Sequence, residues 1–173
     1  LEEGLDFVIV ARPAAGELAR QGGERAIEEA LGADIAMCFD ECTHWPATHQ
    51  EAERSLDLTL RWAAQCREQP RAEGQLVFGI AQGSTYRDLR ERAVQELEKL
   101  DFDGIAVGGV SVGESEQLMV DVLNYCAPVL PVSKPHYLMG VGTPRQIVIG
   151  ILNGIDMFDC VLPTRMGRNG SAY

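Results

Sequence analysis

The chain has 173 residues, of which 46% are hydrophobic, and it carries a formal net charge of -11 at pH 7. This length and composition suit one domain with its own core, whereas the acidic balance argues against a generally basic nucleic-acid binder. Phosphate contacts would therefore need a local patch of Lys and Arg. No apolar run reaches the length of a membrane span, which excludes a membrane-spanning protein and predicts a soluble, cytoplasmic one.

Five apolar runs, each ending at a polar or glycine-rich junction, predict buried parallel strands. In chain order they are Asp34 to Phe39, Leu76 to Ile80, Gly104 to Val107, His136 to Met139, and a run from Gly154 that ends at Asp159 and Cys160. Helical spacing of apolar residues between these runs predicts helices over Thr48 to Gln69, Thr85 to Lys99, Glu114 to Tyr125 and Thr143 to Leu152.

The second predicted helix has two distinct faces. Leu89, Ala93 and Leu97 recur at helical spacing and predict the side that packs on the sheet. The solvated face is predicted to carry the charged residues of the segment, which are Arg87, Asp88, Arg90, Glu91 and Arg92.

Regular alternation of strand and helix predicts an α/β protein with parallel strands and helical crossovers, either an open doubly wound sheet or a closed barrel. A dinucleotide-binding sheet should carry a glycine fingerprint at its first strand-to-helix turn, and none is present. We therefore expect a partial (β/α)8 TIM barrel, of which about five strands lie in this chain.

Such a barrel brings the carboxyl ends of its strands to one mouth. The residues predicted to converge there are Asp40, Gln82, Gly108, Gly109, Gly140 and Asp159. A carboxylate such as Asp40 can accept from the N–H edge of a guanine-like ring, while the amide of Gln82 and the backbone N–H of Gly109 can donate to its carbonyl. Alternatively, Gln82 caps a helix near Ser84 and the two glycines form a plain tight turn.

Asp159 ends the last strand and is followed by Val161 to Gly170, which reads as a Pro-interrupted basic loop. This order places an anion where a nucleophile would lie, and it places Arg165 and Arg168 where a phosphate backbone would pass. An aspartate at a strand end can also serve only as a helix cap or turn residue.

Cysteine usage gives little chemical information. Cys38, Cys42, Cys66, Cys126 and Cys160 are odd in number and contain no close CxxC pair, so neither a disulfide framework nor a local zinc site is supported. Reduced thiols are expected, and no metal ligand is assigned in this chain.

Five ordered segments resemble the bacterial tRNA-guanine transglycosylases, also called the queuine tRNA-ribosyltransferase family. They are Phe39 to Thr43, Gly79 to Gly83, Val107 to Glu114, His136 to Pro144, and Asp156 to Gly170. The resemblance covers residues 24–173, expected to be the central and C-terminal part of the barrel, whereas residues 1–23 match poorly.

The resemblance implies exchange of guanine at the wobble position of tRNAs with a GUN anticodon for the 7-deazaguanine preQ1, in queuosine formation. Asp159 would be the nucleophile, giving a covalent ribosyl-aspartate intermediate as in retaining glycosidases. Val112 and Cys42 fit the bacterial pattern and favour preQ1 over queuine. Rival interpretations are archaeosine-type preQ0 exchange, a non-catalytic tRNA-binding subunit of the same fold, and an unrelated small-molecule barrel enzyme.

The resemblance also assigns the remaining site residues. Glu114 is expected to open a helix, where the dipole favours a carboxylate, and to help arrange the backbone that reads the base. The guanine and preQ1 site is expected to comprise Asp40, Gln82, Gly109, Gly108, Val110, Cys42, Glu114 and Met139. The tRNA contacts are expected at Gly140, Val141, Gly142, Thr143, Pro144, Arg145 and Gln146, unless these form an ordinary strand-to-helix loop, and at Thr164, Arg165, Met166, Gly167 and Arg168.

Two features of the family are missing from this sequence. One is the zinc-binding Cys/His subdomain that follows the Arg-Asn-Gly segment, so zinc is expected for the family but its ligands are not in this chain. The other is an earlier Asp-Ser-Gly-Gly motif whose aspartate is assigned as general base. We therefore expect a fragment that lacks about three strands, is inactive alone, and forms a homodimer when full length.

Overall fold

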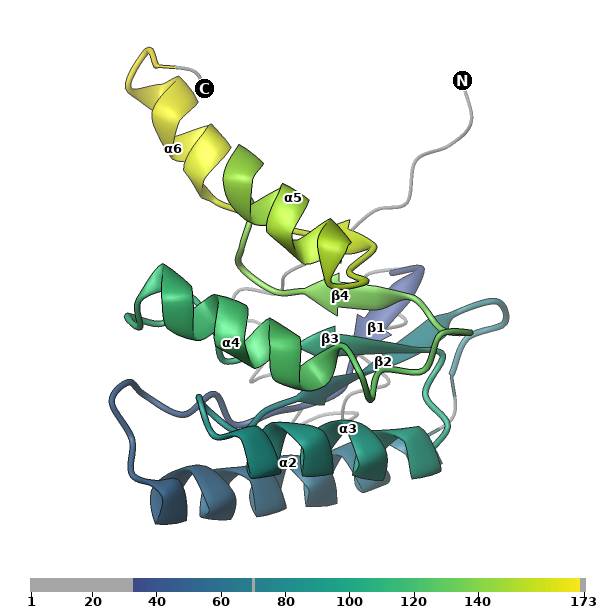
Figure 1. Cartoon of the computed structure of the whole chain (residues 1–173). Coiled ribbons are helices and arrows are strands. Elements are labelled where there is room, and N and C mark those ends of the chain that lie inside the picture. Colours follow the sequence, from purple (N-terminus) through teal and green to yellow (C-terminus); the bar gives the residue numbers. More distant parts are fainter. Residues whose placement is uncertain (1–32, 70, 172–173) are drawn as a thin grey trace.

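A computed structural model describes residues 33–69 and 71–171, so the poorly matching segment 1–23 lies outside the described residues. Strands and helices alternate along the chain (Figure 1). The strands are β1 (Ile35–Met37), β2 (Leu76–Ala81), β3 (Gly104–Val107), β4 (His136–Leu138) and β5 (Met157–Phe158). The helices are α2 (His49–Glu68), α3 (Arg87–Lys99), α4 (Glu116–Cys126), α5 (Pro144–Leu152) and α6 (Leu162–Arg168).

The five strands form one parallel sheet in the order β1-β2-β3-β4-β5. Val107 is the Cα partner of Ala81 on one side and of Leu138 on the other, so the carboxyl ends of neighbouring strands stay level. Together with the helices on its outer side, this sheet is a half-barrel, which confirms the predicted partial (β/α) barrel and its five strands (Figure 1).

Two helices begin at threonine caps, which explains why their predicted bounds are close to the observed ones. Thr48 precedes α2 and Thr143 precedes α5, and each side chain accepts from the backbone N–H three residues on. In turn, the side chain of Glu51 accepts from the backbone N–H of Thr48, and the side chain of Gln146 accepts from that of Thr143. Each helix therefore begins with a complete capping box.

The structure differs from the sequence prediction at three helices. Helix α3 begins at Arg87 rather than Thr85, with Tyr86 as its N-cap. Helix α4 begins at Glu116 rather than Glu114, because Ser115 is its N-cap and accepts from the N–H of Leu118. Residues 162–168, predicted as a loop, form α6; Pro163 lies in its first turn, where the missing N–H of proline leaves no hydrogen bond unmade.

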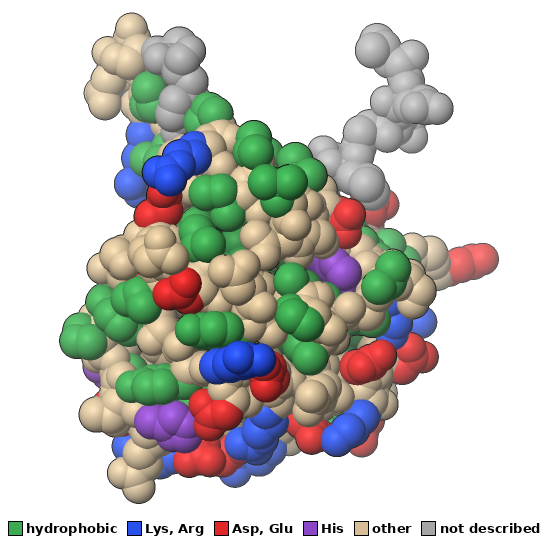
Figure 2. Space-filling model, in the orientation of Figure 1, with side chains coloured by type: hydrophobic (Ala, Val, Ile, Leu, Met, Phe, Trp, Pro, Cys, Tyr) green, Lys and Arg blue, Asp and Glu red, His purple; other side chains and the backbone are tan. Residues whose placement is uncertain are grey.

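Helix α5 exposes several apolar side chains. Val148, Ile151 and Leu152 are 57%, 59% and 81% exposed. Figure 2 shows hydrophobic side chains gathered over the part of the surface where α5 lies. Among the described residues, no helix is long and apolar enough to cross a membrane.

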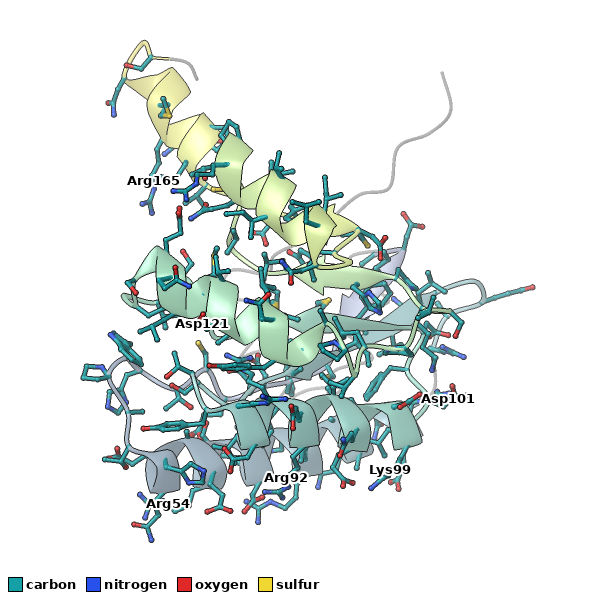
Figure 3. All side chains as sticks on the ribbon, viewed as in Figure 1. Arg54, Arg92, Lys99, Asp101, Asp121 and Arg165 are labelled. Atoms are coloured by element: carbon teal, nitrogen blue, oxygen red, sulfur yellow. The ribbon has the colours of Figure 1, made fainter. Side chains whose placement is uncertain are left out.

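The prediction that Arg90 lies on the solvated face of α3 is wrong. Arg92 and Lys99 do point away from the sheet (Figure 3), but Arg90 is 0% exposed. It lies three residues before Ala93 and four before Val94, both fully buried, and so belongs to the packed side of the helix. The carbonyl groups at the ends of β2 and β3 provide the polar partners that allow this burial.

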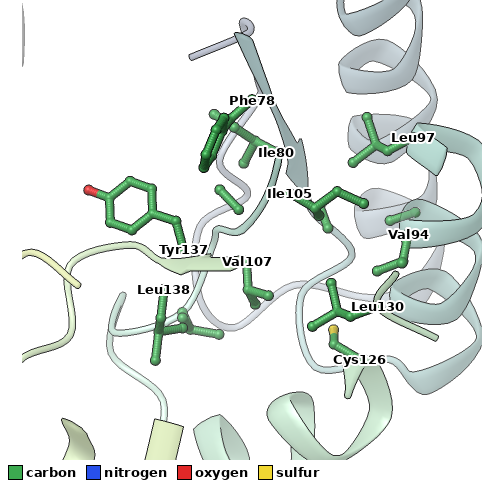
Figure 4. Packing of buried hydrophobic residues seen from close by; sticks show 14 of the residues in the cluster. Phe78, Ile80, Val94, Leu97, Ile105, Val107, Cys126, Leu130, Tyr137 and Leu138 are labelled. Carbon is green, nitrogen blue, oxygen red and sulfur yellow. The ribbon is translucent and has the colours of Figure 1, made fainter. Parts of the chain in front are cut away.

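One part of the core lies between the sheet and the helices, another part lies on the opposite face of the sheet, and both depend on close packing of β2 and β3. Figure 4 shows Ile105 of β3 pointing toward Val94 and Leu97 of α3. A side chain on Gly104 would overlap the ring of Phe78, so this strand position requires glycine. The rigid pairing of β2 with β3 fixes the residues that follow both strands.

Candidate functional site

Asp40 and Gln82 meet at the carboxyl ends of β1 and β2. Nε2 of Gln82 donates to Oδ2 of Asp40 at 2.5 Å. Gln82 is 1% exposed, and its Oε1 has no hydrogen-bond partner among the described residues. The helix-capping alternative for Gln82 is not what the structure shows, since the N-cap of α3 is Tyr86 and no side chain caps it.

The environment of Asp40 favours the neutral forms of nearby acids. Burial raises the pKa of Asp40 above its ordinary value, and the hydrogen bond from Gln82 opposes that rise only in part. Partial burial, followed by the charge of Asp40, also raises the pKa of the Cys42 thiol. This direction favours the thiol form of Cys42 over the thiolate.

Gly108 and Gly109 place backbone directly against Gln82. Gly109 has φ +63°, and a Cβ at this position would overlap Oε1 of Gln82. A Cβ on Gly108 would lie 2.7 Å from Cγ2 of Ile80 and 3.4 Å from Sδ of Met139. Both positions therefore require glycine for close approach, in addition to any turn that they form.

Glu114 organises the segment after β3. Its carboxylate accepts from the backbone N–H of Ser111 and, at 2.9 Å, from that of Val112. Ser111 has φ +61°, a conformation that these bonds help to hold. Val110 is buried in the core, whereas Ser111 and Val112 are exposed. Glu114 thus bonds the backbone before α4, and it precedes that helix rather than opening it.

Asp159 is held by two donors on a single oxygen. Its Oδ1 accepts from the Tyr137 hydroxyl at 2.6 Å and from the N–H of Gly140 at 2.7 Å. Among the described residues, Oδ2 receives no hydrogen bond. Burial, followed by the bond to Asp159, raises the pKa of the Tyr137 phenol, so Tyr137 remains a neutral donor.

Met139 lies between the group formed by Asp40, Gln82 and Gly109 and the group formed by Asp159 and its donors. Its backbone N–H donates to the carbonyl of Val107 at 3.2 Å, and a Cβ on Gly108 would lie near its sulfur. It directly precedes Gly140, which binds Asp159. The Asp40, Gln82 and Gly109 group and the Asp159 group therefore lie at the same edge of the sheet, as neighbours across β3 and β4.

The residues assigned to tRNA contacts fall into two classes. In the segment before α5, Val141 is buried, Thr143 and Gln146 form the capping box, and Gly142 packs so closely on Cys160 that a Cβ would collide. Arg145 pairs with Glu116 at 2.6 Å. The second group is mostly exposed on α6 (Figure 3 labels Arg165) and comprises Thr164, Arg165, Met166, Gly167 and Arg168.

A zinc ion does not fit the residues of this site. Within 33–69 and 71–171, no group of three or more His, Cys, Asp or Glu side chains is arranged to hold a metal ion.

Comparison with known proteins identifies one family. A family model described as "Queuine tRNA-ribosyltransferase" matches residues 24–173. Curated relatives with that name include proteins of Pelotomaculum thermopropionicum (56% identical over 146 residues), Symbiobacterium thermophilum (52% over 149) and Rickettsia bellii (53% over 148). The matches cover 84–86% of this chain but only 37–41% of each relative, so the chain spans well under half the length of these proteins.

Proposed function

This chain belongs to the queuine tRNA-ribosyltransferase family, and on that premise we propose that it contributes the base site and the nucleophile of a tRNA-guanine transglycosylase. The reaction replaces guanine at the wobble position of a GUN-anticodon tRNA by preQ1. The observation that carries the proposal is the geometry of Asp159, whose Oδ1 is fixed by Tyr137 and Gly140 while Oδ2 is left to react.

The chemistry proceeds in two displacements at one carbon. Oδ2 of Asp159 attacks C1′ of the ribose, the bond from C1′ to N9 breaks, and its electron pair leaves with guanine, which takes up a proton at N9. N9 of preQ1 then attacks C1′, loses its proton, and releases the Asp159 carboxylate. Two inversions retain the configuration, and the proton lost in the second step balances the one taken up in the first.

The base would be recognised by the group around Gln82. Nε2 of Gln82 carries two hydrogens and uses one for Asp40, so the other can bond the guanine carbonyl together with the N–H of Gly109. The Asp40 carboxylate can accept from the N–H edge of the ring. Because Gln82 is buried and Asp40 and Gly109 are partly buried, an analogue that leaves them unmatched would bind roughly 10⁴-fold more weakly.

The tRNA would approach over the segment from Gly140 to Gln146 and over α6. Arg165 and Arg168 lie in the last turn of α6 and form part of the local basic patch that an acidic chain needs. Val112 and Cys42 support preQ1 as the incoming base. For the full-length protein we also propose a cytoplasmic homodimer with zinc in a subdomain outside residues 24–173, and residues 1–23 as a divergent segment before the matched part of the barrel.

The test is whether Asp159 forms the covalent intermediate in the full-length protein. Wild-type protein incubated with substrate tRNA should give a protein–tRNA adduct that survives a denaturing gel. Asp159→Asn and Asp159→Ala should give none, because neither side chain offers a carboxylate oxygen to C1′. Asp156→Asn is the matched control: Asp156 also adjoins β5 but bonds the backbone N–H of His136, so the adduct should persist.

An adduct formed by either Asp159 variant would refute the assignment. Wild-type protein that binds tRNA but forms no adduct and incorporates no labelled guanine would instead indicate the non-catalytic tRNA-binding subunit.

A further inference from the structure

The fully buried Arg90 has no role in the reaction described so far. Its Nε donates to the carbonyl of Ser84 at 2.6 Å, and its Nη1 donates to those of Ala81 at 2.8 Å and Gly108 at 2.7 Å. Nη2 donates to the carbonyl of Gly109 at 3.3 Å. One side chain from α3 therefore holds the end of β2 and the backbone that follows β2 and β3.

This arrangement is costly unless it serves a purpose. Burying a guanidinium requires the loss of its hydration, and here four peptide oxygens replace the water. An apolar side chain could fill the same volume on α3 without that loss. The carbonyl groups that Arg90 holds belong to the segments that carry Gln82 and Gly109.

The direction of these carbonyl groups fixes the direction of the next N–H groups. In a planar trans peptide the C=O and the following N–H point in opposite directions. Because the oxygens of Gly108 and Gly109 point toward Arg90, the N–H groups of Gly109 and Val110 point away from it. Neither N–H has a hydrogen-bond partner within the described part of the chain.

We propose that Arg90 is a positioning residue for base recognition: by holding the carbonyl oxygens of Gly108 and Gly109, it presents the N–H groups of Gly109 and Val110 to the carbonyl oxygen of guanine. The inference rests on the proposed function and deepens it. Gln82 belongs to the same assembly, since its Oε1 lies against Gly109 and Arg90 also bonds the carbonyl of Ala81, the residue before Gln82.

The charge of Arg90 adds to this effect. The carbonyl oxygens of these peptides face the buried cation, so the positive N–H ends of the peptide dipoles face the opposite way. The electrostatic potential at the mouth of the site is therefore more positive, which favours an oxygen acceptor there. Arg90 never touches the base, and its contribution is the orientation of the groups that do.

The test is base selectivity in the full-length enzyme. Guanine exchange into tRNA gives the KM for guanine, and competition gives the inhibition constant of 2-aminopurine, which lacks the carbonyl. The analogue also lacks N1–H, but that loss at Asp40 affects wild type and variants alike. Arg90→Met keeps the length and removes the donors, whereas Arg90→Lys keeps the charge but cannot reach four oxygens. Arg92→Met is the matched control, because Arg92 lies on the outer side of α3 and pairs with Asp57.

In Arg90→Met the preference for guanine over 2-aminopurine should fall about 10- to 100-fold, with the KM for tRNA unchanged, because one or two hydrogen bonds to the carbonyl are lost. Arg90→Lys should show a smaller fall in the same direction, and Arg92→Met should match wild type. A variant that is only less stable would lose active protein without changing this ratio.

An unchanged preference for guanine over 2-aminopurine in a folded Arg90→Met would overturn the inference. If Arg90→Met does not fold, the same preference measured in Arg90→Lys decides the question. Failure of both variants to fold would also overturn it, because Arg90 would then serve stability alone. If wild type itself does not exchange guanine, the proposed function fails instead.

Discussion

Asp40 illustrates how a residue proposed to bind the base can oppose the stability of the fold. Burial raises the pKa of its carboxyl group above 3.8, and the bond from Gln82 offsets this only in part. At neutral pH the folded protein therefore holds a carboxylate in surroundings that favour its protonated form. Because the folded-state pKa is the higher one, this penalty is complete at neutral pH and is relieved as pH falls through the folded-state pKa toward 3.8.

We expect Asp40→Asn to be at least as stable as wild type at pH 8, because Oδ1 of Asn can still accept from Gln82 and carries no charge. Its advantage should shrink as pH falls, because the wild-type protein then binds its proton and Asn does not titrate. Thermal denaturation of both proteins from pH 8 down to the ordinary carboxyl pKa of 3.8 measures the difference. Guanine exchange by the variant should drop by about 100-fold or more, since the N–H edge of the base loses its anionic acceptor.

A wild-type protein that gained no stability relative to Asp40→Asn on acidification would show that burial does not govern this carboxyl group. Unchanged guanine exchange in the variant would remove Asp40 from the base site.

At the scale of elements, the segment between β4 and α5 combines a structural role with a proposed functional one. Thr143 caps α5 through its hydroxyl, and Gln146 completes the capping box. Both residues also belong to the proposed tRNA-binding segment. The capping contacts explain their presence without RNA, so stability and tRNA affinity must be measured separately.

We expect Thr143→Ala to lower the free energy of unfolding by about 1 kcal/mol, because the N–H of Gln146 loses its acceptor. Thr143→Ser retains the hydroxyl and should remain close to wild type. Urea denaturation of the three proteins provides the comparison. Equal stability of the Ala variant and wild type would mean that the cap contributes nothing to α5.

The elements that sequence predicts well are those whose signals are local. The apolar runs at β2 and β3 and the threonine caps of α2 and α5 define their own ends, so the strands and most helix bounds are confirmed. The sequence does not predict α6, because Pro163 is typical of a loop as well as of a first helical turn.

The site contacts that sequence does not predict are those that depend on register between distant segments. The charge of Arg90 predicts a solvent-exposed position, yet its spacing from Ala93 and Leu97 places it among buried residues. That spacing was the available signal. Tyr137 lies inside an apolar strand, and only the pairing of β4 with β5 brings its hydroxyl to Asp159.

The whole molecule is an open half-barrel as far as the structure describes it. Among the described residues, β1 and β5 each pair on one side only. Parallel sheets are normally covered on both faces, and unpaired edges promote association with other chains. The exposed side chains Val148, Ile151 and Leu152 of α5 lie next to the β5 end and enlarge this apolar surface.

We therefore expect the purified 173-residue chain to associate with itself as its concentration rises and to exchange no guanine.

The double variant Ile151→Glu and Leu152→Glu should reduce association without lowering the melting temperature, because both side chains are already exposed and lose little packing. Val132→Glu is the matched control, since Val132 is 101% exposed but does not belong to α5. Sedimentation velocity over a range of concentrations distinguishes these cases. Equal association of the double variant and the control would mean that the sheet edges, rather than the α5 surface, hold the copies together. Guanine exchange by the 173-residue chain would show that the half-barrel is sufficient for catalysis.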